Sequence, residues 1–307
     1  MRALMIVNPR ATTTTRRTRD VIVRALGSEL DLRVAHTEHR DHAAALARIA
    51  ADDGMDMVVT LGGDGTVNEA VNGILRDGPD PALPALAPLP GGSANVFVRA
   101  LGLPADPVEA TGLLLEAVRG GGIRTVGLGR ADDRYFTFCA GAGLDAEVVH
   151  RMEGLRANGR RATPTLYIQT AIRQFFRTDR RHPALTIVGE DGTETGPLLL
   201  AIISNTAPWT YAGPRPVNPT PLASFDLGLD VFAMRRMATA PTLNVIRQML
   251  STNGRPPAGR SVVALHDAAG FTVRGARPYA FQLDGEYLGE RDEVAFRSVP
   301  AALRVPV

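Results

Sequence analysis

The sequence VVTLGGDGTVNEAVNG, residues 58–73, decides the fold of the first third of the chain. Its apolar start is typical of a buried strand, Gly-Gly-Asp-Gly follows, and residues 66–75 have the spacing of a helix. A strand that leads through glycines directly into a helix turns bare backbone, amide hydrogens and the positive end of the helix dipole towards a ligand. The stretch therefore predicts an anion site, and a nucleotide phosphate fits it best.

Asp64 lies inside this predicted phosphate loop. Its carboxylate would repel a phosphate unless a divalent cation lay between the two, so the loop implies magnesium. The loop has neither the spaced glycines of the dinucleotide fingerprint nor the Gly-Lys-Ser/Thr of a P-loop, and the chain contains no lysine. The alternative interpretation is a tight Asp-Gly turn, which leaves the other glycines and Thr66 unexplained.

The segments on either side of this stretch alternate short apolar runs with amphipathic ones. This alternation predicts a parallel sheet covered by helices on both faces. The predicted strands are residues 3–7, 32–36, 55–61 and 84–89. The predicted helices are residues 16–26, 42–51, 66–75 and 94–101, with a further helix that starts at Asp106 and Pro107.

A second glycine segment, LPGGSANVFVRALGLP at residues 89–104, follows the last of these strands. Ser93 and Asn95 place short hydrogen-bonding side chains at the start of the next helix. Open parallel sheets bind ligands at the carboxyl ends of their strands, so we expect both glycine segments to face one cleft. The threonines at 12–15 follow the first strand, where phosphate contacts are common, although capping of a helix is the favoured interpretation for any single one of them.

From about residue 125 the pattern changes to short strand-like runs separated by turn residues. This change predicts a nucleotide-binding domain at residues 1–124 and a mainly antiparallel second domain at 125–290. In the second domain, FQLDGEYLG at residues 281–289 places Asp284 and Glu286 on either side of a glycine. Two such carboxylates on one strand would share a face and favour a bound cation or a raised pKa. A hairpin turn at Asp-Gly is an equal alternative.

The composition excludes several classes of protein. The 34 arginines and 32 acidic residues give a net charge of only +2, which argues against a nucleic-acid binder, and the hydrophobic fraction of 45% excludes a mainly disordered chain. Cys139 is the single cysteine and has no intramolecular disulfide partner. No apolar run reaches the roughly 20 residues that span a bilayer. We therefore expect a cytoplasmic protein whose membrane contact, if any, is peripheral at the inner face.

An arginine-rich segment at residues 156–181 leaves the question of membrane contact open. It contains seven arginines and one acid, Asp179. Ile168, Ile172, Phe175 and Phe176 fall on one helical face. Such a helix rests on an anionic bilayer in some proteins and packs on its own domain in others.

Together these segments resemble the diacylglycerol kinase and sphingosine kinase superfamily, specifically the soluble bacterial lipid kinases of the diacylglycerol kinase catalytic domain family. The resemblance covers Asn8-Pro9, Thr37, the two glycine segments, CAGAGLDAEV at 139–148, the segment 205–231 and the Leu-Asp-Gly-Glu at 283–286. It implies a Rossmann-like three-layer amino-terminal domain, completed by about residues 291–307, and a carboxy-terminal antiparallel β-sandwich. It also implies ATP-dependent, magnesium-dependent phosphorylation of a hydroxyl of diacylglycerol or a related lipid.

The resemblance further implies a role for each matching residue. Asp284 would be the general base, and Asp64 would anchor the catalytic magnesium. Asp226 and the carbonyl of Gly228 would occupy a structural magnesium position. The ATP contacts would be Asn8, Thr12, Thr37, Gly62, Gly63, Asp64, Gly65, Thr66, Val67, Asn68, Ser93, Asn95 and Glu286. This assignment requires Asp64 and Asp284 to converge on one triphosphate.

The chain departs from the family pattern at three places. Ala11-Thr12 replaces the usual Ser-Gly after Asn-Pro, Val96 stands where many members have Asp, and Leu227 replaces a usual Gly beside Asp226. These departures weaken three of the family's assignments when they are carried over to this chain: the first phosphate contact, the lipid head group and the structural metal site. They keep open two other functions, an NAD kinase-like enzyme that shares the first glycine loop and a catalytically silent module that binds a nucleotide or a lipid.

Overall fold

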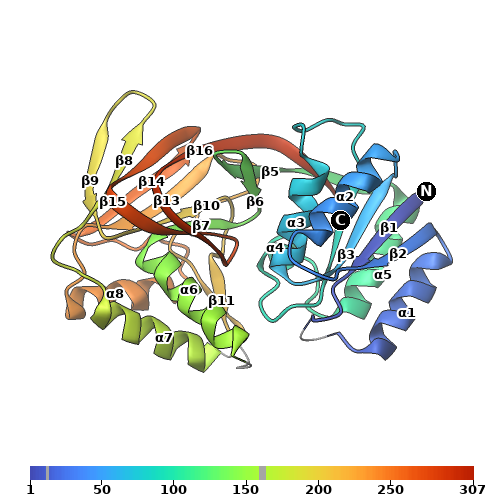
Figure 1. Ribbon diagram of the computed structural model, residues 1–307, viewed down its shortest axis with the longest axis horizontal. Helices are drawn as coiled ribbons and strands as arrows, with labels where there is room; N and C mark the ends of the chain where they lie inside the picture. Colours follow the sequence, from blue (N-terminus) through green and yellow to red (C-terminus); the bar gives the residue numbers. More distant parts are fainter. Residues whose placement is uncertain (12–13, 159–163) are drawn as a thin grey trace. The chain divides into compact units, whose positions relative to one another are not determined.

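The computed structural model describes residues 1–11, 14–158 and 164–307, which form two compact units (Figure 1). Unit 1 comprises Met1–Leu128 and Pro300–Val307, and unit 2 comprises Gly129–Val299. Both boundaries lie beyond those expected from the sequence. The reason is that each boundary falls inside a strand, β5 (Ile123–Ala131) or β16 (Glu286–Pro306), where no turn residue marks it.

Unit 1 is a parallel four-stranded sheet with helices, as predicted. The strands have the order β2-β1-β3-β4, with Val7 opposite Leu61 and Gly62 opposite Pro90. Its elements before the boundary are β1 (Arg2–Val7), α1 (Arg16–Gly27), β2 (Asp31–His36), α2 (His42–Asp52), β3 (Met57–Gly62), α3 (Asp64–Ile74), β4 (Ala85–Pro90), α4 (Val96–Ala100) and α5 (Pro107–Gly120).

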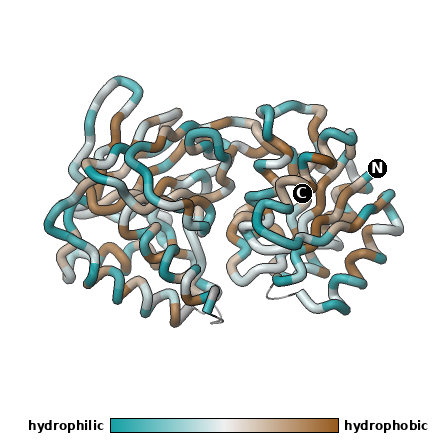
Figure 2. Tube along the Cα trace, viewed as in Figure 1, coloured by the Kyte–Doolittle hydropathy of each residue, from teal (hydrophilic) through white to brown (hydrophobic). Residues whose placement is uncertain are grey.

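The alternation of side chains along the strands of unit 1 sorts its helices onto the two faces of the sheet. Met5 and Leu61 share a core with Ile22 of α1 and Leu114 of α5. The other face of β1 and β3 is covered by α2 and α3 (Figure 1). Figure 2 shows the apolar residues concentrated along these central strands. The strands β1, β3 and β4 are therefore held between layers of helices, whereas the edge strand β2 is largely exposed. The carboxyl ends of all four strands lie at one edge of the sheet.

Unit 2 is built mainly from antiparallel strands, which confirms the predicted change of pattern. Ten strands form one hydrogen-bonded sheet, in which β15 pairs with β8 along its first half and with β7 along its second half. The elements of unit 2 are β6 (Arg134–Phe136), β7 (Cys139–Gly143), α6 (Leu144–Ala157), α7 (Pro164–Arg177), β8 (Leu185–Gly189), β9 (Glu194–Leu198), β10 (Leu200–Ser204), β11 (Thr210–Ala212), β12 (Arg215–Val217), β13 (Leu229–Met234), α8 (Thr239–Met249), β14 (Val262–Ala268) and β15 (Gly270–Leu283).

The sheet of unit 2 has an apolar core on each of its faces. Ala201 and Ile203 of β10 belong to a core shared with β8, β13, β15 and β16. Leu200 and Ile202 of the same strand point the other way and pack with residues of α6, α7 and α8. The helices thus cover one face of the strands, as Figure 1 shows. Among the described residues, no helix is long and apolar enough to cross a bilayer.

Candidate functional site

The two predicted glycine loops of unit 1 lie against each other at the ends of β3 and β4. The amide of Gly91 donates a hydrogen bond to the carbonyl of Gly62 (2.7 Å). A Cβ atom at Gly91 would lie 2.9 Å from the Gly62 nitrogen, and one at Gly92 would lie 2.6 Å from the Gly63 Cα. Backbone cannot give way at such distances, so these glycines are required for the two loops to meet.

The first loop enters its helix two residues earlier than the sequence pattern indicated. Gly63 is the N-cap of α3, and Asp64 is the first helical residue. The amides of the first turn of a helix have no intrahelical acceptor, which makes this end of α3 a suitable anion site. Val67 is an exception among the predicted contacts, because its side chain is buried and its amide donates to the Gly63 carbonyl (3.2 Å).

Asp64 and Asn95 fix the start of α4. The Oδ1 atom of Asp64 accepts a hydrogen bond from the amide of Phe97 (3.2 Å). Asn95 has a left-handed backbone (φ 49°), and its side chain bridges the amide and the carbonyl of Gly92, both at 2.8 Å. Ser93 is exposed in the turn between Gly92 and Asn95. The structure therefore gives Asp64 and Asn95 roles in holding the second loop in place.

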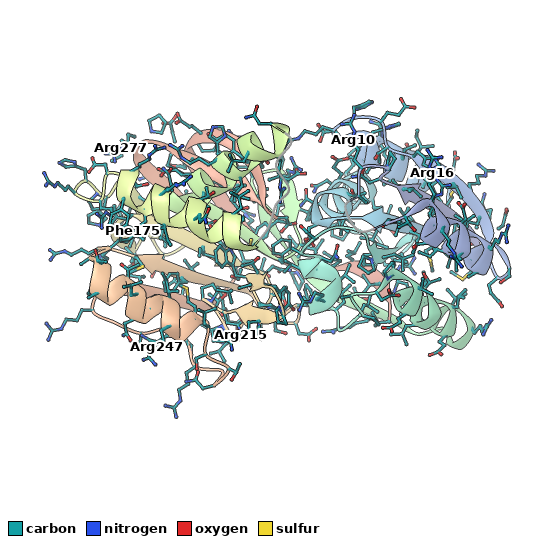
Figure 3. All side chains as sticks on the ribbon, turned by 90° about the horizontal axis from the view of Figure 1, so that it is seen from below. Arg10, Arg16, Phe175, Arg215, Arg247 and Arg277 are labelled. Carbon is teal, nitrogen blue, oxygen red and sulfur yellow. The ribbon has the colours of Figure 1, made fainter. Side chains whose placement is uncertain are left out.

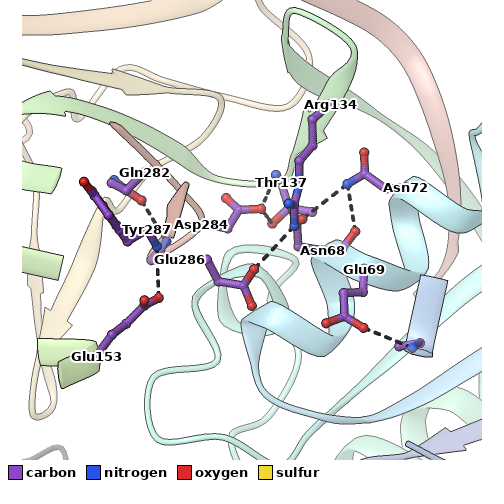
Figure 4. A network of polar contacts seen from close by, with 12 residues as sticks. Asn68, Glu69, Asn72, Arg134, Thr137, Glu153, Gln282, Asp284, Glu286 and Tyr287 are labelled. Carbon is purple, nitrogen blue, oxygen red and sulfur yellow. Dashed lines mark hydrogen bonds and ion pairs between the residues drawn. The ribbon is translucent and has the colours of Figure 1, made fainter. Parts of the chain in front are cut away.

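The remaining predicted residues of unit 1 lie around the same sheet edge. Asn8 donates through its amide to the Leu61 carbonyl (3.0 Å) and through its side chain to the Thr66 hydroxyl (3.2 Å). The Thr37 amide donates to the Val7 carbonyl (2.9 Å). Asn68 is buried, and its carbonyl accepts from the Asn72 side chain (2.9 Å; Figure 4). Thr12 lies outside the described residues.

Thr14 is a site residue that the sequence did not single out among the four threonines. Its hydroxyl oxygen is buried and has no hydrogen-bond partner within the part of the chain that the structure describes. The same oxygen lies 3.0 Å from the place that a Cβ of Gly91 would take. Thr15, by contrast, caps α1, where its hydroxyl accepts from the Thr18 amide (3.1 Å). A buried hydroxyl without a partner beside the glycine loops points to a missing acceptor.

The Asp284-Gly285 pair of unit 2 forms the turn of a hairpin. β15 ends at Leu283 and β16 begins at Glu286, which pairs with it. Asp284 (φ 48°) and Gly285 (φ 78°) both have the left-handed backbone that a type I′ turn requires. Asp284 and Glu286 are therefore not neighbours on one face of a strand, and the alternative of a hairpin is the one that the structure shows.

The carboxylate of Asp284 is buried and accepts four hydrogen bonds from residues 137–139, at the start of β7 and just before it (Figure 4). Oδ2 accepts from the amide (2.7 Å) and the hydroxyl (2.8 Å) of Thr137. Oδ1 accepts from the amides of Phe138 (3.0 Å) and Cys139 (3.1 Å). Burial raises the pKa of Asp284 above its ordinary value, while these hydrogen bonds act in the opposite direction. The carboxylate thus clamps the hairpin to β7.

Glu286 and Gln282 flank this turn. Glu286 pairs with Arg134 at 3.3 Å, and both side chains are about three-quarters buried. The Gln282 side chain accepts from the amide of Gly285 (2.9 Å) and donates to Asp145 (2.8 Å). Gln282 therefore connects the turn of the hairpin to the first turn of α6.

Asp145 is a second buried carboxyl that the sequence analysis did not single out. It is 8% exposed, and burial raises its pKa from 3.8 to about 6, with the Gln282 hydrogen bond opposing this shift. A carboxyl that titrates near neutrality beside a polar turn is a candidate for proton transfer. The signal in the sequence was its position after the glycines of β7, within the segment 139–148.

The predicted structural metal position lies in an exposed loop before β13. Asp226 is exposed, and its amide donates to the Ser224 hydroxyl (3.3 Å). The amide of Gly228 donates to Oδ1 of Asp267 (2.6 Å). Among the described residues, no group of three or more His, Cys, Asp or Glu side chains is placed to hold a metal ion.

The first part of the chain is similar to known proteins. Residues 2–131 match the family model of the diacylglycerol kinase catalytic domain. A protein described as a probable lipid kinase YegS-like, from Chromohalobacter salexigens, is 40% identical over 128 residues, which are 42% of this chain and 39% of that protein. The diacylglycerol kinase of Bacillus subtilis is 34% identical over 108 residues, which are 35% and 34% of the two chains. The chain thus spans well under half the length of these relatives.

Two solved structures resemble the whole chain. A diacylglycerol kinase from Bacillus anthracis has a TM-score of 0.77 and 22% identity, and the match covers 99% of this chain and 96% of that one. An NAD kinase from Archaeoglobus fulgidus, solved in complex with ATP, has a TM-score of 0.55 and 13% identity, with 100% and 94% covered. At these identities the matches establish the fold.

Proposed function

We propose that this protein, whose residues 2–131 match the model of the diacylglycerol kinase catalytic domain, is a kinase that transfers a phosphoryl group from ATP to a lipid hydroxyl. The observation that carries the proposal is the contact between the two glycine loops at the edge of the parallel sheet, where Gly91 donates to Gly62 beside the start of α3. The acceptor class, diacylglycerol or a related lipid, rests on the family.

The residues of unit 1 fit a nucleotide triphosphate. The first turn of α3 offers backbone amides, and the unpartnered hydroxyl of Thr14 offers a donor beside Gly91. Asn8 and Thr66, which are joined by a hydrogen bond, would lie at the edge of the same nucleotide site. Mg²⁺ prefers carboxylate and phosphate oxygens, and Asp64 is the acidic side chain in the first turn of α3. Bound there, the ion would neutralise charge on the transferred phosphoryl group.

The hydrogen bonds of Asp284 constrain its proposed role as general base. A carboxylate has about four acceptor positions, and four protein donors are aimed at this one. To accept the proton of a lipid hydroxyl, Asp284 must exchange one of these donors for the substrate. The Thr137 hydroxyl is the donor that turns away most easily, because it rotates about one side-chain bond while the three amides are fixed in the backbone. We propose that this exchange accompanies acceptor binding.

Glu286 and Asp226 keep proposed roles that follow from the family. Glu286, held by Arg134, would contact ATP or its magnesium ion. Asp226 would contribute to a structural magnesium site with the carbonyl of Gly228. Asp226 is exposed to solvent, from which a hydrated ion would come.

The outer face of α7 supports peripheral membrane contact of this kinase. The predicted apolar stripe divides in the structure, because Phe175 packs against the core beneath the helices while Ile172 (54% exposed) and Phe176 (63% exposed) project from it. The guanidinium of Arg180 lies 4.3 Å from the ring centroid of Phe175. A helix that presents apolar side chains among arginines suits an anionic bilayer surface. Pelleting with anionic but not zwitterionic liposomes, lost in Phe176→Ser, is the expected result.

Radiolabelled ATP, offered with diacylglycerol, other hydroxylated lipids and NAD in separate reactions, tests the proposed function. A labelled lipid supports it. Labelled NAD would instead favour the NAD kinase-like alternative, and the absence of any labelled product, together with retained ATP binding, would favour a silent binding module. Asp64→Asn serves as the matched inactive variant, because Asn retains an acceptor for the Phe97 amide while removing the charge that holds magnesium.

A further inference from the structure

Unit 2 contains a cavity of about 750 Å³ between α6, α7 and strand β15. One row of α6, at residues 147, 150, 151 and 154, faces a row of α7 at 170, 173, 174 and 177 across it, both with the spacing of a helix face. Leu185, Leu198 and Leu199 line it from the sheet side. The whole lining belongs to unit 2, whereas both glycine loops belong to unit 1, so the cavity and the loops share no residue.

Four arginines surround this cavity, namely Arg151 of α6, Arg173 and Arg177 of α7, and Arg277 of β15, which Figure 3 labels. Arg151 donates to the side chain of Gln174, and Arg277 donates to the carbonyl of His182 (2.9 Å). Arg173 and Arg177 make no hydrogen bond or ion pair with any residue that the structure describes. Their Cβ atoms lie about 6 Å apart, because they are four residues apart on a helix. Two guanidinium groups at this spacing leave their donors to a ligand.

The carboxylates of the cavity do not neutralise these two arginines. Glu147 accepts hydrogen bonds from Gln174 (2.6 Å) and from the Thr178 hydroxyl (2.5 Å). Asp179 accepts from His182 (2.7 Å), and this bond lowers the pKa of Asp179 below its ordinary value. Glu290 is the third acidic residue of the lining. Neither engaged carboxylate forms an ion pair with Arg173 or Arg177.

The buried part of the lining is polar as well as apolar. Thr170 is 5% exposed and Gln174 is 7% exposed, and both lie on the face of α7 that carries Arg173 and Arg177. Tyr279 (6% exposed) and the leucines supply an apolar wall opposite them. A ligand that fits has an anionic group for the arginines and a less polar remainder for this wall. Guanidinium groups match the tetrahedral oxygens of a phosphate through paired hydrogen bonds.

We propose that this cavity is a phosphate-binding site in which Arg173 and Arg177 hold the anion, with Arg151 and Arg277 on its flanks. The phosphate is either that of a phosphorylated lipid, whose glyceryl and alkyl parts lie against Leu198, Leu199 and Tyr279, or free inorganic phosphate. In both cases the site is additional to the nucleotide site of unit 1 and does not depend on the proposed kinase activity.

Calorimetric titration of the full chain tests the proposal with three probes, namely inorganic phosphate, dihexanoyl phosphatidate below its micellar concentration, and dihexanoyl phosphatidylcholine at the same concentration. We expect saturable binding of at least one of the first two and none of the zwitterionic lipid. Tighter binding of the phosphatidate than of inorganic phosphate identifies a lipid ligand, and equal affinity identifies the free anion. No saturable heat with either anion overturns the proposal.

A matched set of variants locates the binding. Arg173→Gln with Arg177→Gln should weaken binding about tenfold or more, the size expected for losing charge-assisted hydrogen bonds. Arg247→Gln on α8, an arginine outside the lining that Figure 3 shows well away from Arg277, should leave it unchanged. Because Arg173 and Arg177 are exposed and without partners, the double variant should keep the wild-type Tm. Gly91→Ala, which disturbs the nucleotide loops, should not alter phosphate affinity. A loss of phosphate affinity in Gly91→Ala, with no loss in the double variant, would place the anion in unit 1 and refute the site.

Discussion

Asp284 and Thr137, 147 residues apart in the sequence, are joined by two hydrogen bonds to a single carboxylate oxygen, one from the Thr137 amide (2.7 Å) and one from its hydroxyl (2.8 Å). Both residues are almost completely buried. The type I′ turn that carries Asp284 is therefore fixed to the segment before β7 by charge-assisted bonds, which are stronger than neutral ones. This side chain adds to the backbone pairing of β15 with β7 in fixing the hairpin, and with it the position of Glu286.

Replacing Asp284 by Asn should destabilise unit 2. The Asn side chain keeps one acceptor oxygen but turns an NH₂ group towards two donors, which leaves buried groups unpaired at a cost of about 2–4 kcal/mol. Thr137→Val removes one donor and keeps the amide, so we expect a smaller loss of about 1–2 kcal/mol. Asp292→Asn, at an exposed position of β16, is the control. Urea unfolding should show the largest loss of stability in Asp284→Asn, a smaller loss in Thr137→Val and the smallest in Asp292→Asn. An Asp284→Asn protein as stable as Asp292→Asn would show that the Asp284 carboxylate does not hold the hairpin to β7.

The same Asp284→Asn protein tests the proposed general base when it is assayed at a temperature at which it is folded. We expect ATP to raise its Tm as it does in the wild type, because the glycine loops belong to unit 1. We expect no turnover of lipid, whereas Thr137→Val should retain turnover. Wild-type turnover in folded Asp284→Asn would remove Asp284 from the chemistry and leave it the structural role alone.

The contact between the glycine loops predicts opposite effects of Ala at two glycines of unit 1. In Gly91→Ala the new Cβ would lie 2.9 Å from the Gly62 nitrogen, so the loops must separate at a cost of about 1–3 kcal/mol. In Gly112→Ala, on the exposed face of α5, nothing lies within 4 Å, and Ala should stabilise by about 0.5–1 kcal/mol. Thermal melts with and without ATP and Mg²⁺ measure both effects. Gly91→Ala should also lose the stabilisation by ATP, and its retention would mean that the loop contact is not needed for nucleotide binding.

Two neighbouring threonines should separate nucleotide binding from helix capping. Thr14→Val removes a buried hydroxyl that has no described partner, so the protein without ATP should be as stable as the wild type or slightly more so. Its affinity for ATP should fall about tenfold, the loss of one or two hydrogen bonds. Thr15→Val removes the cap of α1 and should cost about 1 kcal/mol while ATP affinity is unchanged. The same response in both variants would place Thr14 outside the nucleotide site.

Much of unit 1 was predictable from local sequence because its elements carry strong local signals. Buried parallel strands appear as continuous apolar runs, and Asp106 before Pro107 is a helix start whose side chain accepts from the amides of Val108 and Glu109. The two glycine segments end adjacent strands, so their meeting followed from the order of the sheet. What local sequence could not show was that Asp64 would already be helical and hydrogen-bonded to Phe97.

The site of unit 2 was less predictable because its contacts join distant segments. The four donors to Asp284 lie some 145 residues earlier in the chain, and no spacing pattern identifies them. Helix α6 was not predicted, since apolar residues do not gather on one of its faces. Asp145 at its start therefore drew no attention as a buried acid, although its contact with Gln282 makes it part of the hairpin cluster.

The raised pKa of Asp145 predicts a stability that increases as the pH falls. Burial moves the pKa from 3.8 in the unfolded chain to about 6 in the folded protein. Between these two values the folded protein holds a proton that the unfolded chain has released, so acidification favours folding there. Above about pH 7 the group is ionised in both states, and the buried charge costs about 3 kcal/mol at most.

Asp145→Asn isolates this effect, because Asn is neutral at every pH and keeps an oxygen for the Gln282 hydrogen bond. Urea unfolding should show the variant more stable than the wild type at pH 7.5. The difference should shrink as the pH falls through about 6 and should vanish only below pH 3.8, where Asp145 is protonated in the folded and the unfolded wild type alike. Asp284 titrates in both proteins and cancels from the difference. Asp292→Asn, which replaces an exposed carboxyl, should differ from the wild type by the same small amount at each pH. A difference for Asp145→Asn that grows on acidification would show that the folded protein holds Asp145 ionised, and that Gln282 outweighs the burial of its charge.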